Sequence, residues 1–446
     1  MISMYEEQKH IFRRYDIRGI FGKDLTPEIV SRIGLSVAFY SPCTFAVGGD
    51  IRKSTPIIMN SLISGLTSGG VDVYDIGIVP IGTAIYSTFH KGLGMAYVTA
   101  SHLPPEWNGI KLSRPKGDLM VGRDIVDIMN IFYSKEFSPK DYLHVGKVVK
   151  VEILEEYTSF LLKHLKGGNL KVVIDCGNGV AAKVAPQILR DLGYKVVTIN
   201  CDIDPRFPAR GSEPEPEKLQ LLSKVVRETN ADFGVAFDGD GDRTLFLDEK
   251  GNFLSAEQAA IVMLEGGERG DIIANVECST ILDSYAQEKC CKIYRVPVGR
   301  TFMIREMQKR NAVLGVESSG HFVASKNLNM DDGIVTLIYF AYSLSNIGKP
   351  LSQIIPEKLP FKKIRIDVAS DKVKFALMER LKDKLATMSD KVSFIDGIRI
   401  DLEHGWVLIR PSNTEPVIRV TIEAYTEEKL KSFEDKFLGI IREQMK

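Results

Sequence analysis

The segment DGDGDR places carboxylates at positions 238, 240 and 242, separated by single glycines. In an extended loop, alternate residues face the same side, so the oxygens of Asp238, Asp240 and Asp242 can converge on one cation. Hard oxygen ligands of this kind suit Mg²⁺ or Ca²⁺. Three carboxylates this close repel one another unless something cationic binds them, so the segment predicts a metal site.

Two kinds of calcium loop compete with a catalytic metal site at this segment. An EF-hand is excluded, because its sixth loop position would be Arg243 instead of glycine, and because the flanking segments have the pattern of strands. A structural calcium loop remains open.

A serine at the end of an apolar run is the second candidate, in the segment AYVTASHLPPEWNGIKL. The run stops at Thr99, Ser101 and His102 follow, and two prolines stiffen what comes next. Loops at strand ends carry the chemistry of many α/β folds, so Ser101 could be a nucleophile, a phosphate carrier or a plain turn residue. It does not lie in a G-x-S-x-G motif, which excludes the nucleophile elbow of the α/β-hydrolases.

Two further polar segments suit a phosphorylated sugar. ESSGH offers Glu317 and Ser319 for sugar hydroxyls, and His321 for proton transfer or for a phosphate. RPSNTEP offers a guanidinium fork, hydroxyls and an amide, which together suit a phosphate monoester. Its donors are Arg410, Ser412, Asn413 and Thr414. Taken alone, this last segment could equally be an ordinary hairpin turn.

A unit of strand, helix, strand, helix and strand occurs three times and must position these segments. Its copies begin near residues 44, 170 and 271, and their third strands end in TASH, DGDGDR and ESSGH. From about residue 361 the pattern changes to that of an antiparallel sheet with two helices. We therefore expect three similar mixed α/β domains and a smaller C-terminal α+β domain around a central cleft.

Composition narrows the class of protein. The chain has 446 residues, 44% hydrophobic and 26% charged, and its 58 basic residues balance 58 acidic ones. This balance argues against a nucleic-acid or anionic-membrane surface, and no apolar run reaches the length of a membrane span. The first ten residues lack the apolar core of a secretion signal, and the six cysteines form no CxxC pair. We expect a cytoplasmic protein with reduced thiols.

Four segments in this order, TASHLP, DGDGDR, ESSGH and RPSNTEP, resemble the α-D-phosphohexomutase family over essentially the whole chain. The RPSNTEP loop and the segment FPARGSEPEPEKL resemble phosphomannomutase/phosphoglucomutase members of archaeal type. The resemblance implies interconversion of hexose 1-phosphate and hexose 6-phosphate, for mannose, glucose or both, through an enzyme phosphoserine and a sugar 1,6-bisphosphate. The alternatives are a phosphoglucosamine mutase and a sugar-phosphate binding protein without catalysis.

The resemblance also implies roles for the domains and residues. The expected domains are 1–148 with the phosphoserine, 149–252 with the metal, 253–360 with the sugar site and 361–446 with a phosphate site. Ser101 would carry the phosphoryl group and, with Asp238, Asp240 and Asp242, would hold Mg²⁺. Assistance at the reacting end is assigned to Arg18, His102, Lys111, Arg243 and His321. Substrate binding is assigned to Tyr15, Arg300, Glu317, Ser319, Arg410, Ser412, Asn413 and Thr414.

Further expectations follow from the same resemblance. Glucose or mannose 1,6-bisphosphate would be the activator, hexose phosphates the only partners, and the protein a monomer or a homodimer.

Three positions depart from the family pattern. Leu103 replaces the usual Asn of the serine loop, Glu277 stands where several bacterial members have Lys, and Arg300 stands where some have His.

Overall fold

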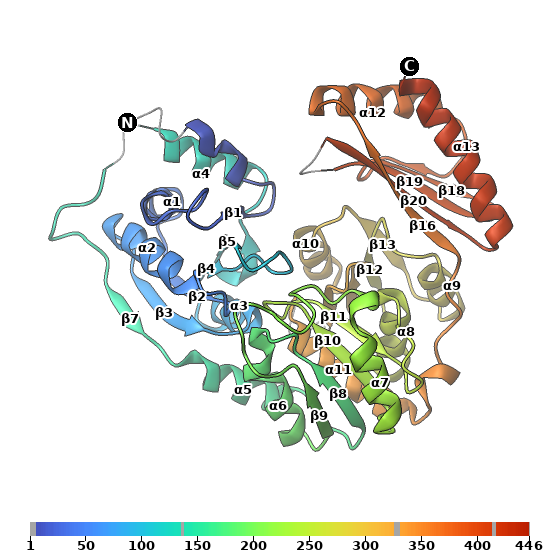
Figure 1. Cartoon of the computed structure of the whole chain (residues 1–446), viewed down its shortest axis with the longest axis horizontal. Helices are drawn as coiled ribbons and strands as arrows, with labels where there is room; N and C mark the ends of the chain where they lie inside the picture. The colour runs from blue at the N-terminus through green and yellow to red at the C-terminus, as the bar shows by residue number, and fades with distance from the viewer. Residues whose placement is uncertain (1–5, 135–137, 325–330, 413–415, 446) are drawn as a thin grey trace. The chain divides into compact units, whose positions relative to one another are not determined.

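The computed structural model describes residues 6–134, 138–324, 331–412 and 416–445 (Figure 1). The chain divides into two compact units, one of residues 1–254 with 330–354 and one of residues 255–329 with 355–446. Each unit is described by itself. Together they contain the three α/β domains and the C-terminal α+β domain that the sequence predicts, which confirms the fold class.

The first sheet of unit one has the strand order β1-β5-β4-β2-β3-β7, with β6 paired to β5. Its strands are β1 (Ile17–Ile20), β2 (Phe45–Gly49), β3 (Val73–Ile78), β4 (Gly94–Val98), β5 (Trp107–Arg114), β6 (Asp118–Leu119) and β7 (Val148–Lys150). Its helices are α1 (Pro27–Tyr40), α2 (Thr55–Ser68), α3 (Ile81–His90) and α4 (Arg123–Tyr133). β2 runs parallel to both β3 and β4, so the ends of β2 and β4 lie side by side.

The second sheet of unit one has the order β11-β10-β8-β9. Its strands are β8 (Lys171–Asp175), β9 (Lys195–Ile199), β10 (Phe233–Phe237) and β11 (Thr244–Leu247), and its helices are α5 (Ile153–His164), α6 (Ala185–Asp191) and α7 (Gln220–Glu228). β8 runs parallel to β9 and β10, while β11 returns antiparallel from the DGDGDR loop.

Helix α11 (Gly333–Ile347) belongs to unit one, although it lies within the expected third domain, 253–360. Its Phe340 ring stacks on the ring of Phe246 with centroids 3.9 Å apart. At its N-terminus, the hydroxyl of Tyr157 from α5 donates a hydrogen bond to the carboxylate of Asp332. Apolar packing and a buried hydrogen bond thus attach this helix to the second sheet. The expected domain boundaries stay a prediction.

Unit two contains the third sheet, of order β13-β12-β14-β15, and the C-terminal sheet, of order β16-β20-β19-β18-β17. The third sheet consists of β12 (Ile272–Asn275), β13 (Ile293–Val296), β14 (Leu314–Val316) and β15 (Phe322–Ala324), with helices α8 (Ala256–Gly266), α9 (Ile281–Glu288) and α10 (Arg300–Arg310). The C-terminal domain consists of β16 (Phe361–Asp367), β17 (Val392–Ser393), β18 (Ile398–Leu402), β19 (Gly405–Pro411), β20 (Val417–Ala424), α12 (Asp371–Leu385) and α13 (Glu427–Met445).

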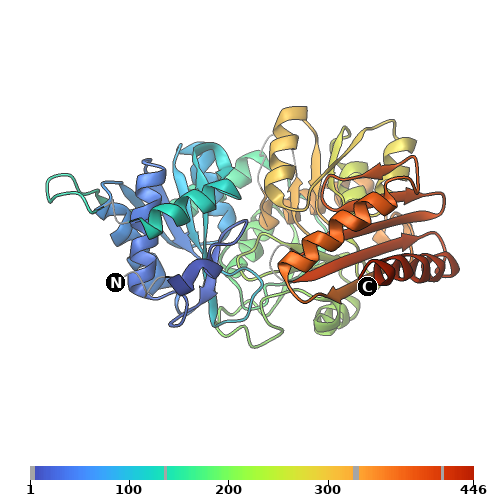
Figure 2. The same ribbon diagram turned by 90° about the horizontal axis from the view of Figure 1, so that it is seen from above.

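Alternate side chains of β19 pack into two different apolar clusters of unit two. Val407 and Ile409 face α12 and α13, which cover the same face of the sheet (Figures 1 and 2). Trp406 and Leu408 point the other way and pack against Val276. Because successive side chains of a strand face opposite sides, one strand buries apolar groups in two cores. Among the described residues, no helix combines the length and apolar character needed to cross a bilayer.

Candidate active site

Ser101 lies just beyond the end of β4 in a constrained conformation. Its backbone is in the left-handed region, with φ at 50°, and only 2% of the residue is exposed. Its N–H donates to Oγ1 of Thr99 at 2.8 Å, and its hydroxyl donates to Oδ2 of Asp238 at 2.7 Å. A left-handed serine is held only where its surroundings over-determine it, so the hydroxyl is fixed against that carboxylate.

Arg52, which the sequence reading missed, organises the serine loop from the end of β2. Its buried guanidinium pairs with Asp50 and donates to the carbonyl oxygens of Ser101 and Leu103, at 2.8 and 2.7 Å. It also donates to the carbonyl oxygens of Pro104 and Trp107. The sequence pattern that could have indicated Arg52 is the charged pair Asp50 and Arg52 directly after an apolar strand, in the segment GGDIRK.

The side chain of Leu103 does not provide the loop's hydrogen bonds. The carbonyl of Leu103 accepts from Arg52 and from the hydroxyl of Ser212, the latter at 2.8 Å. Its N–H donates to the carbonyl of Ala100 at 3.0 Å. The loop is therefore held through backbone groups at position 103, and leucine there leaves that network intact.

The DGDGDR loop folds around Asp238. Oδ1 of this carboxylate accepts the N–H groups of Gly241, Asp242 and Arg243, each at 3.1 Å. Gly241 has φ at 78°, which favours glycine. A Cβ at position 239 would lie 2.6 Å from the carbonyl oxygen of Ser101, so glycine at that position lets the two loops meet.

Lys111, on β5, bridges the other two carboxylates. Its Nζ lies 2.7 Å from Oδ2 of Asp240 and 2.8 Å from Oδ2 of Asp242, and all three side chains are buried. Thr99 adds a hydroxyl at 3.1 Å from the same oxygen of Asp240. Burial raises the pKa of Asp238 well above its ordinary value, and the charges of Asp242 and Asp240 raise it further. The cluster therefore needs positive charge to stay ionised.

The three carboxylates could hold a metal ion. Asp238, Asp240 and Asp242 each offer an oxygen within 4.8 Å of the others. Oδ1 of Asp240 is buried and has no hydrogen-bond partner among the described residues, so it can accept a cation directly. The Lys111 ammonium shows that positive charge is already accommodated there. These oxygen donors fit Mg²⁺.

Cations surround the serine. Arg18 on β1 pairs with Asp16 at 2.7 Å and donates to the carbonyl of Ala100 at 3.4 Å. Nδ1 of His102 lies 3.5 Å from Oγ of Ser101. Burial, helped by the charges of Arg243, Arg18 and Lys111, lowers the pKa of His102 to about 2. The imidazole is therefore neutral at ordinary pH, and the positive potential at the serine comes from arginine and lysine.

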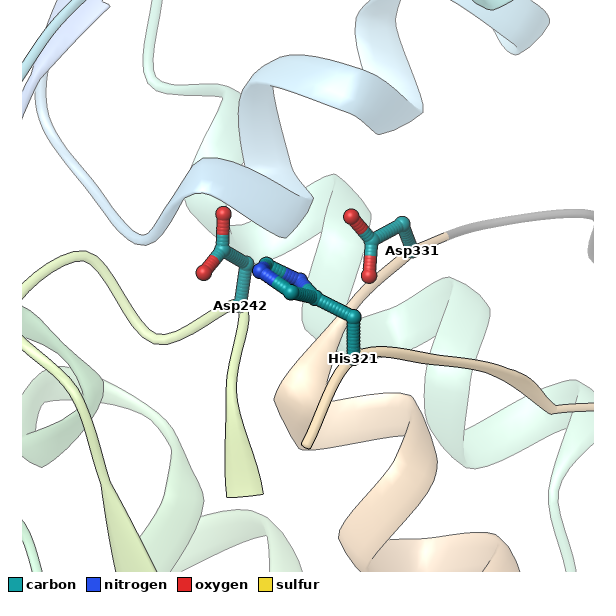
Figure 3. A group of neighbouring side chains, drawn as sticks. All are labelled: Asp242, His321 and Asp331. Carbon is teal, nitrogen blue, oxygen red and sulfur yellow. The ribbon is translucent and has the colours of Figure 1, made fainter. Parts of the chain in front are cut away.

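Unit one also contains two further predicted residues, Arg243 and Tyr15, and one residue that was not predicted, Asp331. Arg243 directly follows the acidic loop and pairs with Glu213 at 3.4 Å. Tyr15 precedes β1, with the guanidinium of Arg14 over its ring. Asp331, just before the N-cap of α11, brings a carboxylate oxygen within 4.8 Å of one from Asp242 (Figure 3). Asp331 was missed because it lies far from the acidic loop in sequence.

Unit two carries the ESSGH segment between β14 and β15. Oε1 of Glu317 accepts the N–H of Gly299 at 2.7 Å, and its carbonyl accepts the N–H of Gly320 at 3.0 Å. Ser319 is exposed at the tip of this turn, and His321 directly precedes β15. Arg300 is the first residue of α10 and directly follows Gly299. The carboxylate of Glu317 is thus fixed next to the start of α10.

Arg410 lies near the end of β19 between two carboxylates. Its Nη1 is 2.7 Å from Oε1 of Glu277, and its Nε is 3.1 Å from Oδ2 of Asp396. The carbonyl of Ser412 accepts from the ammonium of Lys374 at 2.7 Å. Asn413 and Thr414 lie outside the described residues. Glu277, which departs from the family pattern, is therefore a direct partner of the predicted phosphate-binding arginine.

A serine hydroxyl fixed against a three-carboxylate loop, on repeated α/β domains followed by a C-terminal domain, suits an enzyme that transfers phosphoryl groups. Models of phosphoglucomutase/phosphomannomutase α/β/α domains I, II and III match residues 9–138, 152–251 and 253–360, and the C-terminal domain model matches residues 364–440. The chain belongs to this family of α-D-phosphohexomutases, as its four motifs predict.

Relatives with different names cover nearly the whole chain. A probable phosphoglucosamine mutase of Methanosarcina acetivorans is 36% identical, over 98% of this chain and 100% of its own. A phosphoglucomutase/phosphomannomutase of Thermococcus kodakarensis is 32% identical, over 98% and 99%. A crystal structure of a phosphoglucomutase/phosphomannomutase family protein from Burkholderia thailandensis superposes with a TM-score of 0.88 at 27% identity, over 98% and 97% of the two chains.

Proposed function

We propose that this protein interconverts hexose 1-phosphates and hexose 6-phosphates, accepts both mannose and glucose, and carries the phosphoryl group on Ser101. The observation that carries the proposal is the hydroxyl of Ser101 at 2.7 Å from Asp238, with Lys111 bridging Asp240 and Asp242 beside it. Positioning and charge neutralisation are what phosphoryl transfer requires of a protein.

In the proposed reaction, the bond between the Ser101 oxygen and phosphorus breaks, and the phosphoryl group passes to the free hydroxyl of a hexose monophosphate. That hydroxyl loses its proton, and the Ser101 oxygen takes up a proton. The product is a hexose 1,6-bisphosphate. After the sugar turns over, its other phosphoryl group passes to Ser101, whose hydroxyl loses its proton, and the released sugar oxygen takes up a proton. Glucose or mannose 1,6-bisphosphate would act as activator by phosphorylating an unmodified Ser101.

The residues proposed to hold Mg²⁺ are Asp238, Asp240 and Asp242, with an oxygen of the phosphoserine. When bound, the ion supplies counter-charge to the phosphoryl oxygens. Lys111, whose ammonium pairs with Asp240 and Asp242, would serve as the proton-transferring group at the reacting end once it has lost its proton. Arg18, Arg243 and the neutral His102 would stabilise and orient that group.

Substrate recognition is proposed for unit two, with Tyr15 of unit one. Glu317 and Ser319 would bind neighbouring sugar hydroxyls, and Arg300 would contact the sugar phosphate. His321 would assist at the reacting end. Arg410, Ser412, Asn413 and Thr414 would bind the non-reacting phosphate. Support comes from Ser319, whose side chain is exposed, and from the guanidinium of Arg410, whose present partners are two carboxylates that a phosphate can replace. A cytoplasmic location and a monomeric or dimeric state remain predictions.

Substrate breadth tests the proposal. Because the bisphosphate must bind in two opposite orientations, a single site can strictly recognise only features that both orientations share. Glucose and mannose differ only at C2, so kcat/KM for the two 1-phosphates should differ by no more than about 10–200-fold. Glucosamine phosphate should be poorer. Coupled assays with each sugar and a trace of bisphosphate measure these ratios, and a hexose ratio above roughly 10⁴ would show that the site recognises C2.

Phosphoglucosamine mutation is the second candidate, because the Methanosarcina acetivorans relative at 36% identity is named a probable phosphoglucosamine mutase. The same panel separates the two proposals. A glucosamine phosphate kcat/KM above that of both hexoses would favour this candidate. Absence of turnover with every sugar, in protein shown to carry phosphate on Ser101, would indicate binding without catalysis.

Arg52 provides a test of loop positioning. In Arg52→Lys, one ammonium replaces a planar fork that serves several carbonyl groups, so the serine loop should shift. We expect kcat to fall by roughly 100-fold, the cost of about 1 Å of misplacement, with KM little changed. Arg32→Lys is the matched control, because Arg32 also donates to two carbonyl oxygens, on Phe132 and Ser134, but lies on α1. Equal kcat for both variants, with unchanged melting temperatures, would contradict this role.

Glu277 provides a test of phosphate binding at Arg410. A substrate phosphate must compete with the Glu277 carboxylate, which lies 2.7 Å from the guanidinium. In Glu277→Gln we expect KM to fall by roughly 2- to 10-fold, the range of a partly buried charge pair, with little change in kcat. Glu434→Gln, which removes an exposed ion pair to Lys362 in the same unit, should leave KM unchanged. A rise in KM would show instead that Glu277 positions Arg410 for the phosphate.

A further inference from the structure

Two cysteine thiols meet beyond the ends of neighbouring strands in unit one. Cys176 directly follows β8, and Cys201 lies two residues after the end of the neighbouring parallel strand β9. Their Sγ atoms are 3.0 Å apart. A disulfide bond is about 2.05 Å long, so a movement of roughly 1 Å would let the two sulfurs bond.

The other cysteines of the chain are placed differently. Cys278 is buried and donates to Oδ1 of Asn275 at 3.2 Å and to the carbonyl of Val316. Cys43 lies beside the hydroxyl of Ser41. Cys290 and Cys291 are adjacent in sequence, and adjacent residues rarely bridge. Among the residues that the structure describes, Cys176 and Cys201 are the thiols in mutual contact.

The two thiols differ in access and acidity. Cys176 is buried, and burial raises the pKa of its thiol well above the ordinary value. Cys201 is half-buried, and its hydrogen bond with Cys176 lowers its pKa. Since the thiolate is the attacking species and must be reachable, Cys201 suits the first attack on an external oxidant and Cys176 the second, internal one.

We propose that Cys176 and Cys201 form a reversible disulfide in the folded protein, by exchange with a low-molecular-weight disulfide. The Cys201 thiolate attacks one sulfur of the external disulfide, whose S–S bond breaks, and one small thiolate leaves. Cys176 then loses its proton, and its thiolate attacks Sγ of Cys201 and displaces the second small thiolate. The two protein thiols lose two electrons and two protons, and the small disulfide is reduced to two thiols.

The proposed disulfide would lie close to side chains that contact the segment just before the DGDGDR loop. Asp175, next to Cys176, pairs with Arg210 at 3.2 Å and accepts from the side-chain amide of Asn200 at 3.2 Å. Arg210 in turn donates to the carbonyl of Phe237 at 2.6 Å, the residue directly before Asp238. A disulfide here would link the ends of β8 and β9 and restrict the unfolded chain, so the oxidised protein should melt several degrees higher.

The test uses the full-length folded protein and oxidised glutathione. After incubation, remaining thiols are alkylated under native and then denaturing conditions, and unreduced peptides are analysed by mass spectrometry. Titratable thiols should fall from six to four, since the bond consumes two of the chain's six cysteines, and Cys176 and Cys201 peptides should be linked. Dithiothreitol should restore all six thiols and the lower melting temperature.

Variants resolve the order of the two steps. Cys176→Ser should stop at a mixed disulfide of Cys201 with glutathione, and Cys201→Ser should leave Cys176 unmodified. Cys278→Ser is the matched control and should form the link as the parent chain does. Retention of six free thiols in the parent chain, a parent chain that stops at the mixed disulfide, or a link between other cysteines would each overturn the proposal. These three readouts need no variant, so a variant that fails to fold leaves the test intact.

Discussion

Replacing Ser101 by alanine should abolish mutase turnover, with a loss of at least about 10³-fold in kcat, because the phosphoryl carrier is removed outright. Neighbouring hydroxyls cannot substitute: that of Thr99 is buried and donates to Asp50 and Asp240. Incubation with glucose 1,6-bisphosphate should add one phosphate to the parent chain and none to Ser101→Ala, as intact-mass analysis will show. Peptide mapping should place the parent's phosphate on Ser101.

A matched control separates loss of the carrier from loss of a buried serine. Ser36→Ala removes a buried hydroxyl that donates to the carbonyl of Arg32 on α1, and this variant should keep both phosphorylation and turnover. Circular dichroism and melting temperature should be close to those of the parent chain for both variants. Parent-like activity in Ser101→Ala, or phosphate found on a different residue of active protein, would refute the proposed role.

Replacing Asp240 by asparagine should lower kcat by roughly 10²-fold or more, because the phosphoryl group loses part of its counter-charge. Asp240 is the sharpest choice of the three carboxylates, since its Oδ1 is buried without a hydrogen-bond partner among the described residues and its Oδ2 is shared by Lys111 and Thr99. Calorimetric titration with Mg²⁺ should show binding to the parent chain and weaker binding to Asp240→Asn.

The control for this prediction is Asp191→Asn, which changes an exposed carboxylate that accepts from Gln187 on α6. It should bind Mg²⁺ and turn over substrate like the parent chain. Exhaustive chelation should stop turnover by the parent chain, and added Mg²⁺ should restore it. Undiminished turnover after chelation would show that the three carboxylates have a structural role or bind Lys111 alone.

Those parts of the site whose chemistry is local in sequence were open to prediction. Alternating carboxylates and glycines predict the acidic loop. An apolar run that ends in polar residues predicts the Ser101 loop. The alternation of strand and helix patterns predicts three α/β domains, because the spacing of apolar residues along the chain depends on which face of each helix or strand is buried. The structure also explains why position 239 is a glycine. The backbone there comes so close to the carbonyl of Ser101 that a side chain would not fit, and this contact could not be predicted from periodicity.

Contacts between distant segments were decided by the tertiary structure alone. Parallel pairing of β2 with β4 brings Arg52 to the carbonyl oxygens of the serine loop, and strand packing brings Lys111 between two aspartates. The contact of Cys176 with Cys201 depends in the same way on which strands are neighbours. The contact of Glu277 with Arg410 depends on how two separate sheets of unit two pack together. A sequence records the period and polarity of each element, whereas partners far along the chain are chosen by packing and sheet register, which one chain's periodicity does not encode.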